Sequence, residues 1–243
     1  MNKIIPVSAG VIFVAAAFFA WRIYEVRHAP PPPYVGFVRD SSGSDAVSCA
    51  AVRSLAMGLF DLPGIRRGSK AALITTGDKH NAYEGKLAGV FDIPFTTLVM
   101  EGKEATRRRQ QQFGDAIQQA CEATPQTGQS PIFAAVKSGI EHLRANGCGK
   151  TSSCALFVVT DGDENVDGLL RSALNGSKTS LGKIRGIIVN DGIKVNFCGF
   201  AQTRVTPVAH RSQRGTSADR LKEVWTALFT APALVGTAPY CPD

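Results

Sequence analysis

The 243-residue chain has little of what would mark several common protein classes. Its 13 prolines and 24 glycines are close to average usage, which excludes a collagen-like chain and a chain disordered throughout. Six cysteines are too few for a small disulfide-built scaffold, so a hydrophobic core must supply the stability. The four histidines show no zinc-binding spacing with the cysteines, and there is no glycine-rich phosphate loop. The length then favours one good-sized domain with an appendage.

The charge balance is basic, with 27 Lys and Arg against 20 Asp and Glu and a formal net charge of +7. This excess is spread along the chain, as ordinary solubility requires. Arginine runs at 66–67 and 107–109 and the basic segment 204–214 are the exceptions. Exposed helix or loop charge is the simpler interpretation of these runs, with anionic lipid or nucleic acid as the alternative. We expect no nucleic-acid partner.

The amino end carries a long uncharged stretch from Ile4 to Trp21. As a helix this stretch spans about 27 Å, close to the ~30 Å hydrocarbon layer of a bilayer. Trp21 and Tyr24 fall where an interfacial aromatic belt belongs. The pattern predicts a transmembrane anchor over residues 4–24, preceded by a short tail at 1–3. A cleaved signal peptide is the alternative, although the available cleavage sites are poor.

Residues 25–33 form a proline-rich linker that ends in four consecutive prolines. Such a run adopts a stiff polyproline II helix of ~3.1 Å per residue, which would hold a domain away from a bilayer. A ligand for an SH3-type domain is the alternative. The folded domain is predicted to span residues 34–243. We expect it on the periplasmic or extracellular side, because long domains translocate largely regardless of flanking charge.

Beyond the linker, short apolar runs alternate with helical patterns. Strands are expected at residues 34–39, 71–75, 95–100, 154–160 and 194–200. Helices are expected at residues 46–59, 103–122, 131–144, 180–190 and 217–229. Continuous apolar strands interleaved with helices indicate a mainly parallel sheet that is covered on both faces. The predicted fold class is therefore α/β, doubly wound and mostly parallel.

Polar clusters lie where two of these strands end and where one helix begins. Ligands of doubly wound sheets bind beyond the carboxyl ends of the strands, at the point where the strand order reverses. The candidate ligands are Asp40, Ser42, Ser44, Ser130 and Asp161. Alternation in the Asp-x-Ser-x-Ser segment lets its three oxygens converge on one point. An all-oxygen set with two carboxylates suits Mg²⁺, with Mn²⁺ or Ca²⁺ as alternatives.

These residues resemble the metal-ion-dependent adhesion site (MIDAS) of the von Willebrand factor A (VWFA) domain family. That family has Asp-x-Ser-x-Ser after the first strand, a threonine at the start of a later helix, and Thr-Asp-Gly after the fourth strand. Asp40, Ser42 and Ser44 match the first element. Asp161 matches the later aspartate, and Ser130 stands where threonine is usual. The resemblance implies a binding domain without enzymatic activity, which captures an acidic side chain of a partner protein through the metal.

Each candidate ligand also has an ordinary structural interpretation. Ser130 precedes a proline and could simply cap the following helix. The two aspartates could end their strands by forming turns, and Ser42 and Ser44 could cap the helix at 46–59.

Three further interpretations of the chain stay open. Residues 163–168 match the start of an EF-hand calcium loop, but the twelfth position is Leu174 instead of a bidentate Glu. The enzymatic alternative is a Mg²⁺-dependent phosphatase of the haloacid dehalogenase type that uses Asp161 and Asp163. The third is a structural assembly protein whose metal site does not function.

The cysteines carry a separate prediction. Cys148 and Cys154 are close in sequence and flank a loop, which permits a disulfide. Cys49, Cys121 and Cys198 fall on core-facing elements, where free thiols are common. An even number of cysteines suits an oxidising compartment, but the pairing cannot be deduced from the sequence.

Overall fold

The computed structural model of the protein describes residues 33–41, 49–61, 65, 68–77, 84–94, 102–125, 129–149, 154–162, 164–198 and 218–237. All of these residues lie in one compact unit, Pro32–Asp243. The predicted tail, anchor and linker lie outside them, apart from Pro33, and so do Ser42 and Ser44. Within the described stretches, no helix has the length and apolar character needed to cross a bilayer.

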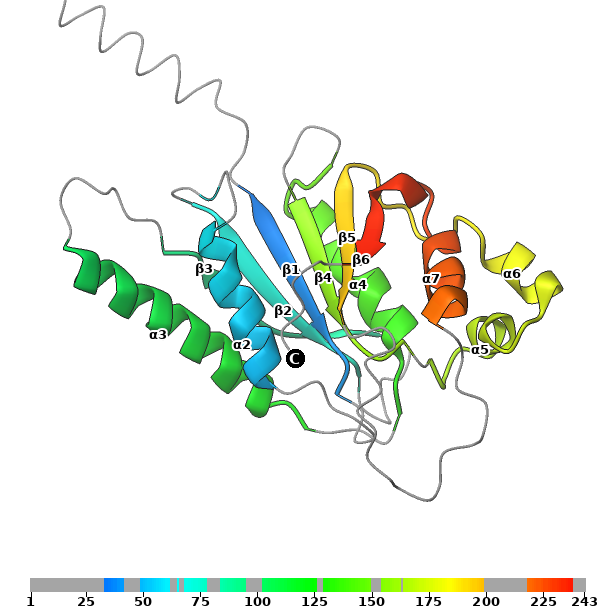
Figure 1. The fold of residues 1–243 in the computed structure, drawn as a ribbon, viewed down its shortest axis with the longest axis horizontal. Helices are drawn as coiled ribbons and strands as arrows, with labels where there is room; N and C mark the ends of the chain where they lie inside the picture. The colour runs from blue at the N-terminus through cyan, green and yellow to red at the C-terminus, as the bar shows by residue number, and fades with distance from the viewer. Residues whose placement is uncertain are drawn as a thin grey trace, which may run out of the picture. The chain divides into compact units, whose positions relative to one another are not determined.

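A six-stranded sheet with the order β3-β2-β1-β4-β5-β6 forms the centre of this unit (Figure 1). Its strands are β1 (Tyr34–Arg39), β2 (Lys70–Thr75), β3 (Lys86–Asp92), β4 (Cys154–Val159), β5 (Ile193–Cys198) and β6 (Val235–Thr237). Every neighbouring pair is parallel except β2 with β3. This order is that of a doubly wound sheet, so the predicted α/β, mostly parallel architecture is confirmed.

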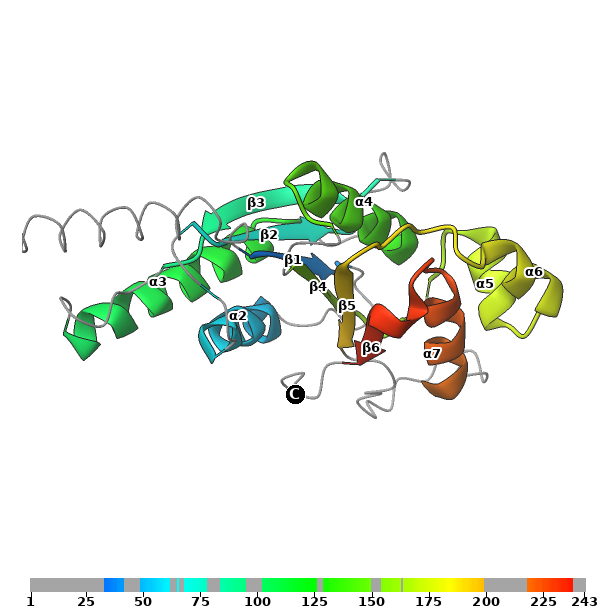
Figure 2. The same ribbon diagram turned by 90° about the horizontal axis from the view of Figure 1, so that it is seen from above.

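Helices cover both faces of the sheet (Figure 2). On one face lie α2 (Cys49–Gly58), the short η1 (Leu59–Asp61) and α3 (Lys103–Glu122). The core on the other face includes side chains of α4 (Ile132–Ala145), α5 (Gly168–Leu174), α6 (Lys178–Ile184) and α7 (Ala218–Ala227). A final short turn, η2 (Pro232–Leu234), precedes β6. In β1, Val35 and Phe37 join the first core, whereas Tyr34 and Val38 join the second. This alternation explains why β1 is buried throughout.

The edge strand β3 differs from the sequence-based prediction. The strand expected at 95–100 lies outside the described residues and stays a prediction, and the structure forms β3 at Lys86–Asp92, which was not predicted. This strand pairs with β2 on one side, and its residues are exposed or half-buried. An edge strand of this kind does not need a continuous apolar run, which is why the apolar pattern missed it.

The region between β4 and β6 also differs from the prediction. The helix expected at 180–190 ends earlier, with α6 closing at Ile184. Gly186 follows with a φ of 67°, a left-handed conformation that favours glycine and ends helices. Ile188 then forms a bridge with Phe229. The short elements α5 and β6 were not predicted, because three to seven residues carry too little periodicity.

The structure pairs the cysteines that it describes. Cys148 and Cys154 form the disulfide that their spacing permits. Cys49 and Cys121, which are 72 residues apart, form a second one. Cys198 is also disulfide-bonded, with a partner outside the described residues. The expectation of free thiols at Cys49, Cys121 and Cys198 is therefore wrong. Spacing could not reveal the Cys49–Cys121 pair, because it depends on α2 packing against α3.

Candidate metal site

The candidate site lies between β1 and β4, at the point where the strand order reverses. From β1 the chain continues outward through β2 and β3, and from β4 it continues the other way through β5 and β6. Arg39 and Val159 are register partners at the carboxyl ends of these two strands. The residues that follow them, Asp40 and Thr160, therefore lie side by side. This is the place where doubly wound sheets bind ligands.

Asp40 is held directly against the end of β4. Its side chain is only 4% exposed, and its backbone N–H donates to the Val159 carbonyl oxygen at 3.0 Å. The Thr160 hydroxyl donates to the Asp40 Oδ2 atom at 3.3 Å, and the same hydroxyl accepts from the Gly162 N–H at 3.0 Å. Thr160 thus orients the Asp40 carboxylate and begins the turn that carries Asp161.

Ser41 faces away from β4, as the alternation of the segment predicts. Its backbone N–H donates to the Thr76 hydroxyl at 2.9 Å, and its own hydroxyl contacts that same group. Thr76 directly follows β2, so the beginning of the Asp-x-Ser-x-Ser segment is fixed on both sides. The remaining ligands of this segment, Ser42 and Ser44, lie outside the described residues.

Arg39 places a buried positive charge beside Asp40. The guanidinium donates from Nη1 to the Cys121 carbonyl oxygen at the end of α3, at 3.2 Å. Burial lowers the pKa of Arg39, and the neighbouring Asp40 charge opposes that shift.

Ser130 is buried at the start of α4 without capping that helix. It is 3% exposed, and its backbone N–H donates to Asn165 Oδ1 at 2.8 Å. The N-cap position belongs to Pro131, with no side-chain cap. Within the described part of the chain the Ser130 hydroxyl has no hydrogen-bond partner. Capping therefore does not explain this residue, and a buried hydroxyl without a partner is costly.

Glu164 supplies the cap that Ser130 does not. Its Oε2 atom accepts from the Phe133 N–H in the first turn of α4 at 2.7 Å. Its Oε1 atom accepts from the N–H groups of Val166 at 2.8 Å and Asp167 at 3.1 Å. Burial raises the pKa of the Glu164 carboxyl, and these three backbone hydrogen bonds oppose the rise. The loop after β4 is thereby locked to the start of α4.

The same contacts remove the support for the EF-hand alternative. Asp167 accepts from the Leu170 N–H at 2.7 Å and so caps α5. Glu164 and Asp167, which would belong to a calcium loop, instead brace a loop and cap helices. Asp163 lies outside the described residues.

Trp225 of α7 holds the turn after Asp161 from the opposite side. Its indole is fully buried, and Nε1 donates to the Gly162 carbonyl oxygen at 3.0 Å. Gly162 itself has a φ of 85°, which accounts for glycine at this position. Asp161, between these fixed points, is half-buried.

The structure therefore brings three predicted ligands, Asp40, Ser130 and Asp161, to the same edge of the sheet. The described residues contain no group of three or more His, Cys, Asp or Glu that could hold a metal ion. The candidate set instead combines two carboxylates with hydroxyl oxygens, a donor set that suits Mg²⁺. The buried Ser130 hydroxyl, which has no partner among the described residues, fits such a ligand.

Sequence reasoning pointed to Thr160 through the Thr-Asp-Gly motif but missed three other residues that support this edge. They are Glu164, Asn165 and Trp225. No sequence signal marked these three, because their partners are 31, 35 and 63 residues away in the sequence.

No protein-family model matches the chain, and no curated protein matches it in sequence. Several solved structures are similar to it. The pilus adhesin SpaC from Lactobacillus rhamnosus GG is 14% identical, with a TM-score of 0.45, over 88% of this chain and 28% of the adhesin. The proximal thread matrix protein 1 from the mussel byssus is 14% identical, with a TM-score of 0.41, over 86% of this chain and 44% of that protein.

A third similar structure is the conserved hypothetical protein BatB from Bacteroides thetaiotaomicron, at 13% identity and a TM-score of 0.39, over 84% of this chain and 88% of BatB. The chain spans less than half of the length of the adhesin and of the thread protein. At such scores the likeness carries no argument about activity. The fold class rests on the strand order and on the helices that cover both faces of the sheet.

Proposed function

We propose that the chain is a membrane-anchored domain of the von Willebrand factor A type that binds a protein partner through Mg²⁺. The proposed metal ligands are Asp40, Ser42, Ser44, Ser130 and Asp161. The observation that carries the proposal is the buried Ser130 hydroxyl, which has no partner in the described part of the chain and lies at the switch point. A bound cation would pair with that oxygen and remove the cost of burying it.

The residues of the proposed site have distinct roles. Asp40 and Asp161 supply negative charge, and the serine hydroxyls are neutral donors. Two carboxylates and neutral oxygens leave a bound divalent cation electrophilic enough to attract an acidic side chain of the partner. Thr160 orients Asp40, and Asn165 holds the backbone of Ser130. The chain's own part is to hold these oxygens in place before the partner arrives.

The anchor at residues 4–24 and the linker at 25–33 belong to the same proposal. They would tether the domain, residues 34–243, on the periplasmic or extracellular side. The disulfides of the described residues fit this location, because such bonds persist in oxidising compartments.

Metal-dependent stability tests the proposal. In the full chain in detergent micelles, Mg²⁺ or Mn²⁺ at one hundred times Kd should stabilise the fold by about 2.7 kcal/mol, visible as a higher melting temperature. Asp40→Ala should abolish this gain. The matched control is Asp92→Ala, which removes an 84%-exposed carboxylate from the opposite edge of the sheet and should leave the gain intact.

An unchanged metal-dependent shift in Asp40→Ala would refute the site. Phosphatase turnover that is lost in Asp163→Asn but kept in Ser42→Ala would support the haloacid dehalogenase alternative instead.

A further inference from the structure

The fully buried residues of the long helix α3 all lie in its second half. Its buried residues are Phe113, Gly114, Ile117 and Cys121. The first half, residues 103–112, has no buried residue. Figures 1 and 2 show α3 beginning away from the sheet. A half-helix of this length gains little from propensity alone, since most helical stability in proteins comes from packing.

The first half of α3 is strongly basic. It carries Lys103, Arg107, Arg108 and Arg109 against one acidic residue, Glu104. Cations near a helix N-terminus are disfavoured by the helix dipole, and like charges four residues apart repel. Glu104, three and four residues before Arg107 and Arg108, offsets part of this repulsion, and the half-helix keeps a net positive charge that an anionic surface would balance.

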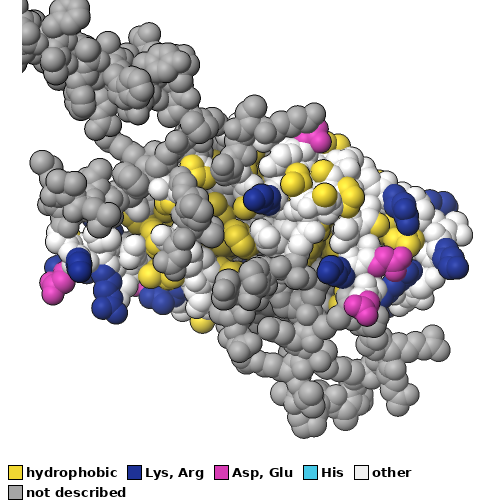
Figure 3. All heavy atoms as spheres, turned by 45° about the horizontal axis from the view of Figure 1, so that its top comes forward, with side chains coloured by type: hydrophobic (Ala, Val, Ile, Leu, Met, Phe, Trp, Pro, Cys, Tyr) yellow, Lys and Arg dark blue, Asp and Glu magenta, His cyan; other side chains and the backbone are white. Residues whose placement is uncertain are grey.

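One face of this half presents the charge together. Glu104, Arg107, Arg108 and Gln111 line an open, shallow hollow of about 460 Å³. The spacing of these residues places them on one side of the helix. Figure 3 shows Lys and Arg side chains gathered at this end of the molecule. Guanidinium groups bind phosphate oxygens in a bidentate manner, which suits them to phosphate-bearing partners.

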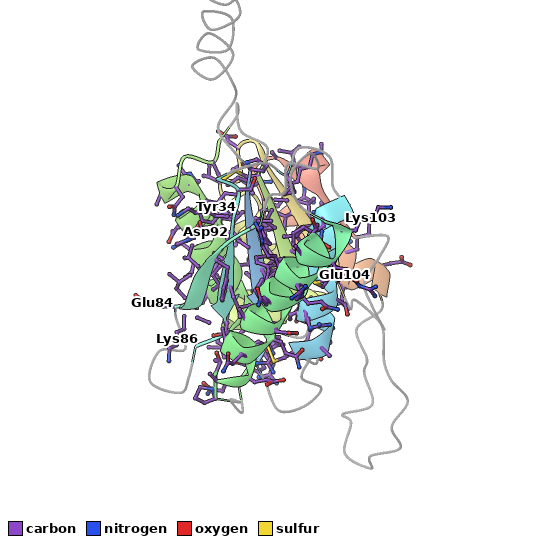
Figure 4. All side chains as sticks on the ribbon, turned by 90° about the vertical axis from the view of Figure 1, so that its left-hand side faces the viewer. Tyr34, Glu84, Lys86, Asp92, Lys103 and Glu104 are labelled. Carbon is purple, nitrogen blue, oxygen red and sulfur yellow. A yellow bond between two sulfur atoms is a disulfide. The ribbon has the colours of Figure 1, made fainter. Side chains whose placement is uncertain are left out.

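The start of α3 lies toward the end of the domain where the chain enters. Asp92, the last residue of β3, is paired with Lys70, the first residue of β2, and α3 then runs back toward the other edge. Figure 4 shows Lys103 toward the same end as Tyr34 and Asp92. The proposed linker of nine residues would span about 28 Å if it adopted polyproline II geometry.

We propose that residues 103–112 of α3 dock onto the phosphate groups of anionic lipid head groups. This inference rests on the proposed anchor, which keeps the half-helix within reach of a bilayer. Charge complementarity and the length of chain between anchor and domain both favour a membrane surface as the occupant. Each basic side chain near an anionic surface contributes about fivefold to the affinity.

The test uses the full chain reconstituted in vesicles of phosphatidylcholine, with or without phosphatidylglycerol. The measured quantity is the ratio of the amide hydrogen-exchange rates of residues 103–112 in the two kinds of vesicle. A change in the intrinsic stability of the helix alters both rates equally and so cancels in the ratio. Exchange should be slower in the anionic vesicles, and added salt should reverse this. Arg107→Gln with Arg108→Gln should weaken docking about 25-fold. The control, Arg171→Gln with Lys183→Gln on α5 and α6, removes the same charge elsewhere and should behave like the wild type.

Two results would overturn the inference: equal exchange in both vesicles, or equal weakening by the control variant. Protection of residues 103–112 by an oligonucleotide but not by anionic vesicles would assign the half-helix to nucleic acid instead. Failure of the anchor is seen separately, because the chain would then not float with neutral vesicles. In that case the inference is tested by binding of the chain to anionic vesicles, which Arg107→Gln with Arg108→Gln should still weaken.

Discussion

Two buried polar residues near the start of α4 differ in how their oxygens are paired. Three backbone N–H groups donate to the Glu164 carboxylate. The Ser130 hydroxyl, in contrast, has no partner within the described stretches. Buried polar groups are normally hydrogen-bonded, so the two residues serve different purposes. Glu164 supports the loop after β4, and Ser130 fits the proposed role of a metal ligand.

Replacement of Ser130 by alanine separates a ligand from a cap. In the absence of metal, Ser130→Ala removes an unpaired hydroxyl and should raise the free energy of unfolding by about 1 kcal/mol. The same variant should lose most of the stabilisation by Mg²⁺. Urea denaturation in EDTA and in Mg²⁺ measures both effects.

The control for this prediction is Ser177→Ala. The Ser177 hydroxyl oxygen accepts from the Ser180 N–H at 3.2 Å and caps α6. Its loss should lower the free energy of unfolding by about 1 kcal/mol and leave the Mg²⁺ effect unchanged. If Ser130→Ala behaves like Ser177→Ala, the ligand role of Ser130 is wrong.

Glu164 gives the protein a specific pH dependence. Burial raises the pKa of this carboxyl on folding, so the folded chain holds the proton more tightly than the unfolded chain. Its contribution to stability is therefore complete below the ordinary pKa of 4.5 and is lost as the pH rises through the raised value. The side chain of Glu164→Gln stays neutral at every pH. As the pH rises through the raised pKa of Glu164, the free energy of unfolding of the wild type should therefore fall relative to that of the variant. Denaturation in EDTA as a function of pH measures the difference.

Glu141→Gln is the matched control for the pH series. Its carboxylate lies on the exposed side of α4, with a side-chain exposure of 59%. The difference between this variant and the wild type should stay small across the same pH range. A flat profile for Glu164→Gln as well would contradict the assigned role of burial.

At the scale of elements, the Cys49–Cys121 disulfide joins the start of α2 to the end of α3. The carbonyl oxygen of Cys121 also accepts from Arg39, next to Asp40. The same end of α3 that packs against the domain thus braces the candidate site, while its other end carries the basic half.

The two disulfides within the described residues should differ in their effect on stability. A disulfide restricts the unfolded chain more when it closes a longer loop. For separations of 72 and 6 residues, this predicts losses of about 4 kcal/mol for Cys49→Ala/Cys121→Ala and about 2 kcal/mol for Cys148→Ala/Cys154→Ala. Guanidinium denaturation of the two double variants measures them side by side. A larger loss for the short loop would contradict this account.

At the scale of the whole molecule, the strand β1 separates the two proposed sites. The chain enters at Tyr34, and the candidate site begins after Arg39, about 20 Å away along the strand. In the proposed arrangement the basic half of α3 and the tether lie at one edge of the sheet. The proposed metal ligands lie at the other edge of the sheet.

The local sequence determined much of this architecture by itself. The apolar runs of β1, β2, β4 and β5 and the periodicity of α3 and α4 were sufficient for the α/β, mostly parallel fold. Asp40 and Asp161 could be predicted as neighbours, because each directly follows a buried parallel strand and such strands end at one edge. These features depend on residues that are close together in the chain, so they can be predicted from local sequence patterns.

Only the tertiary structure decided the rest. The edge strand β3 lacks an apolar pattern because it is not covered on both sides. The Cys49–Cys121 pair, the cap that Glu164 gives to α4 and the contact of Trp225 with Gly162 all join residues that are far apart in the sequence. The pairing of the Ser130 hydroxyl is also a property that only the tertiary structure reveals. A serine before a proline predicts a helix cap. The packing of the loop after β4 against α4 lets Glu164 supply that cap and leaves the Ser130 hydroxyl without a partner among the described residues.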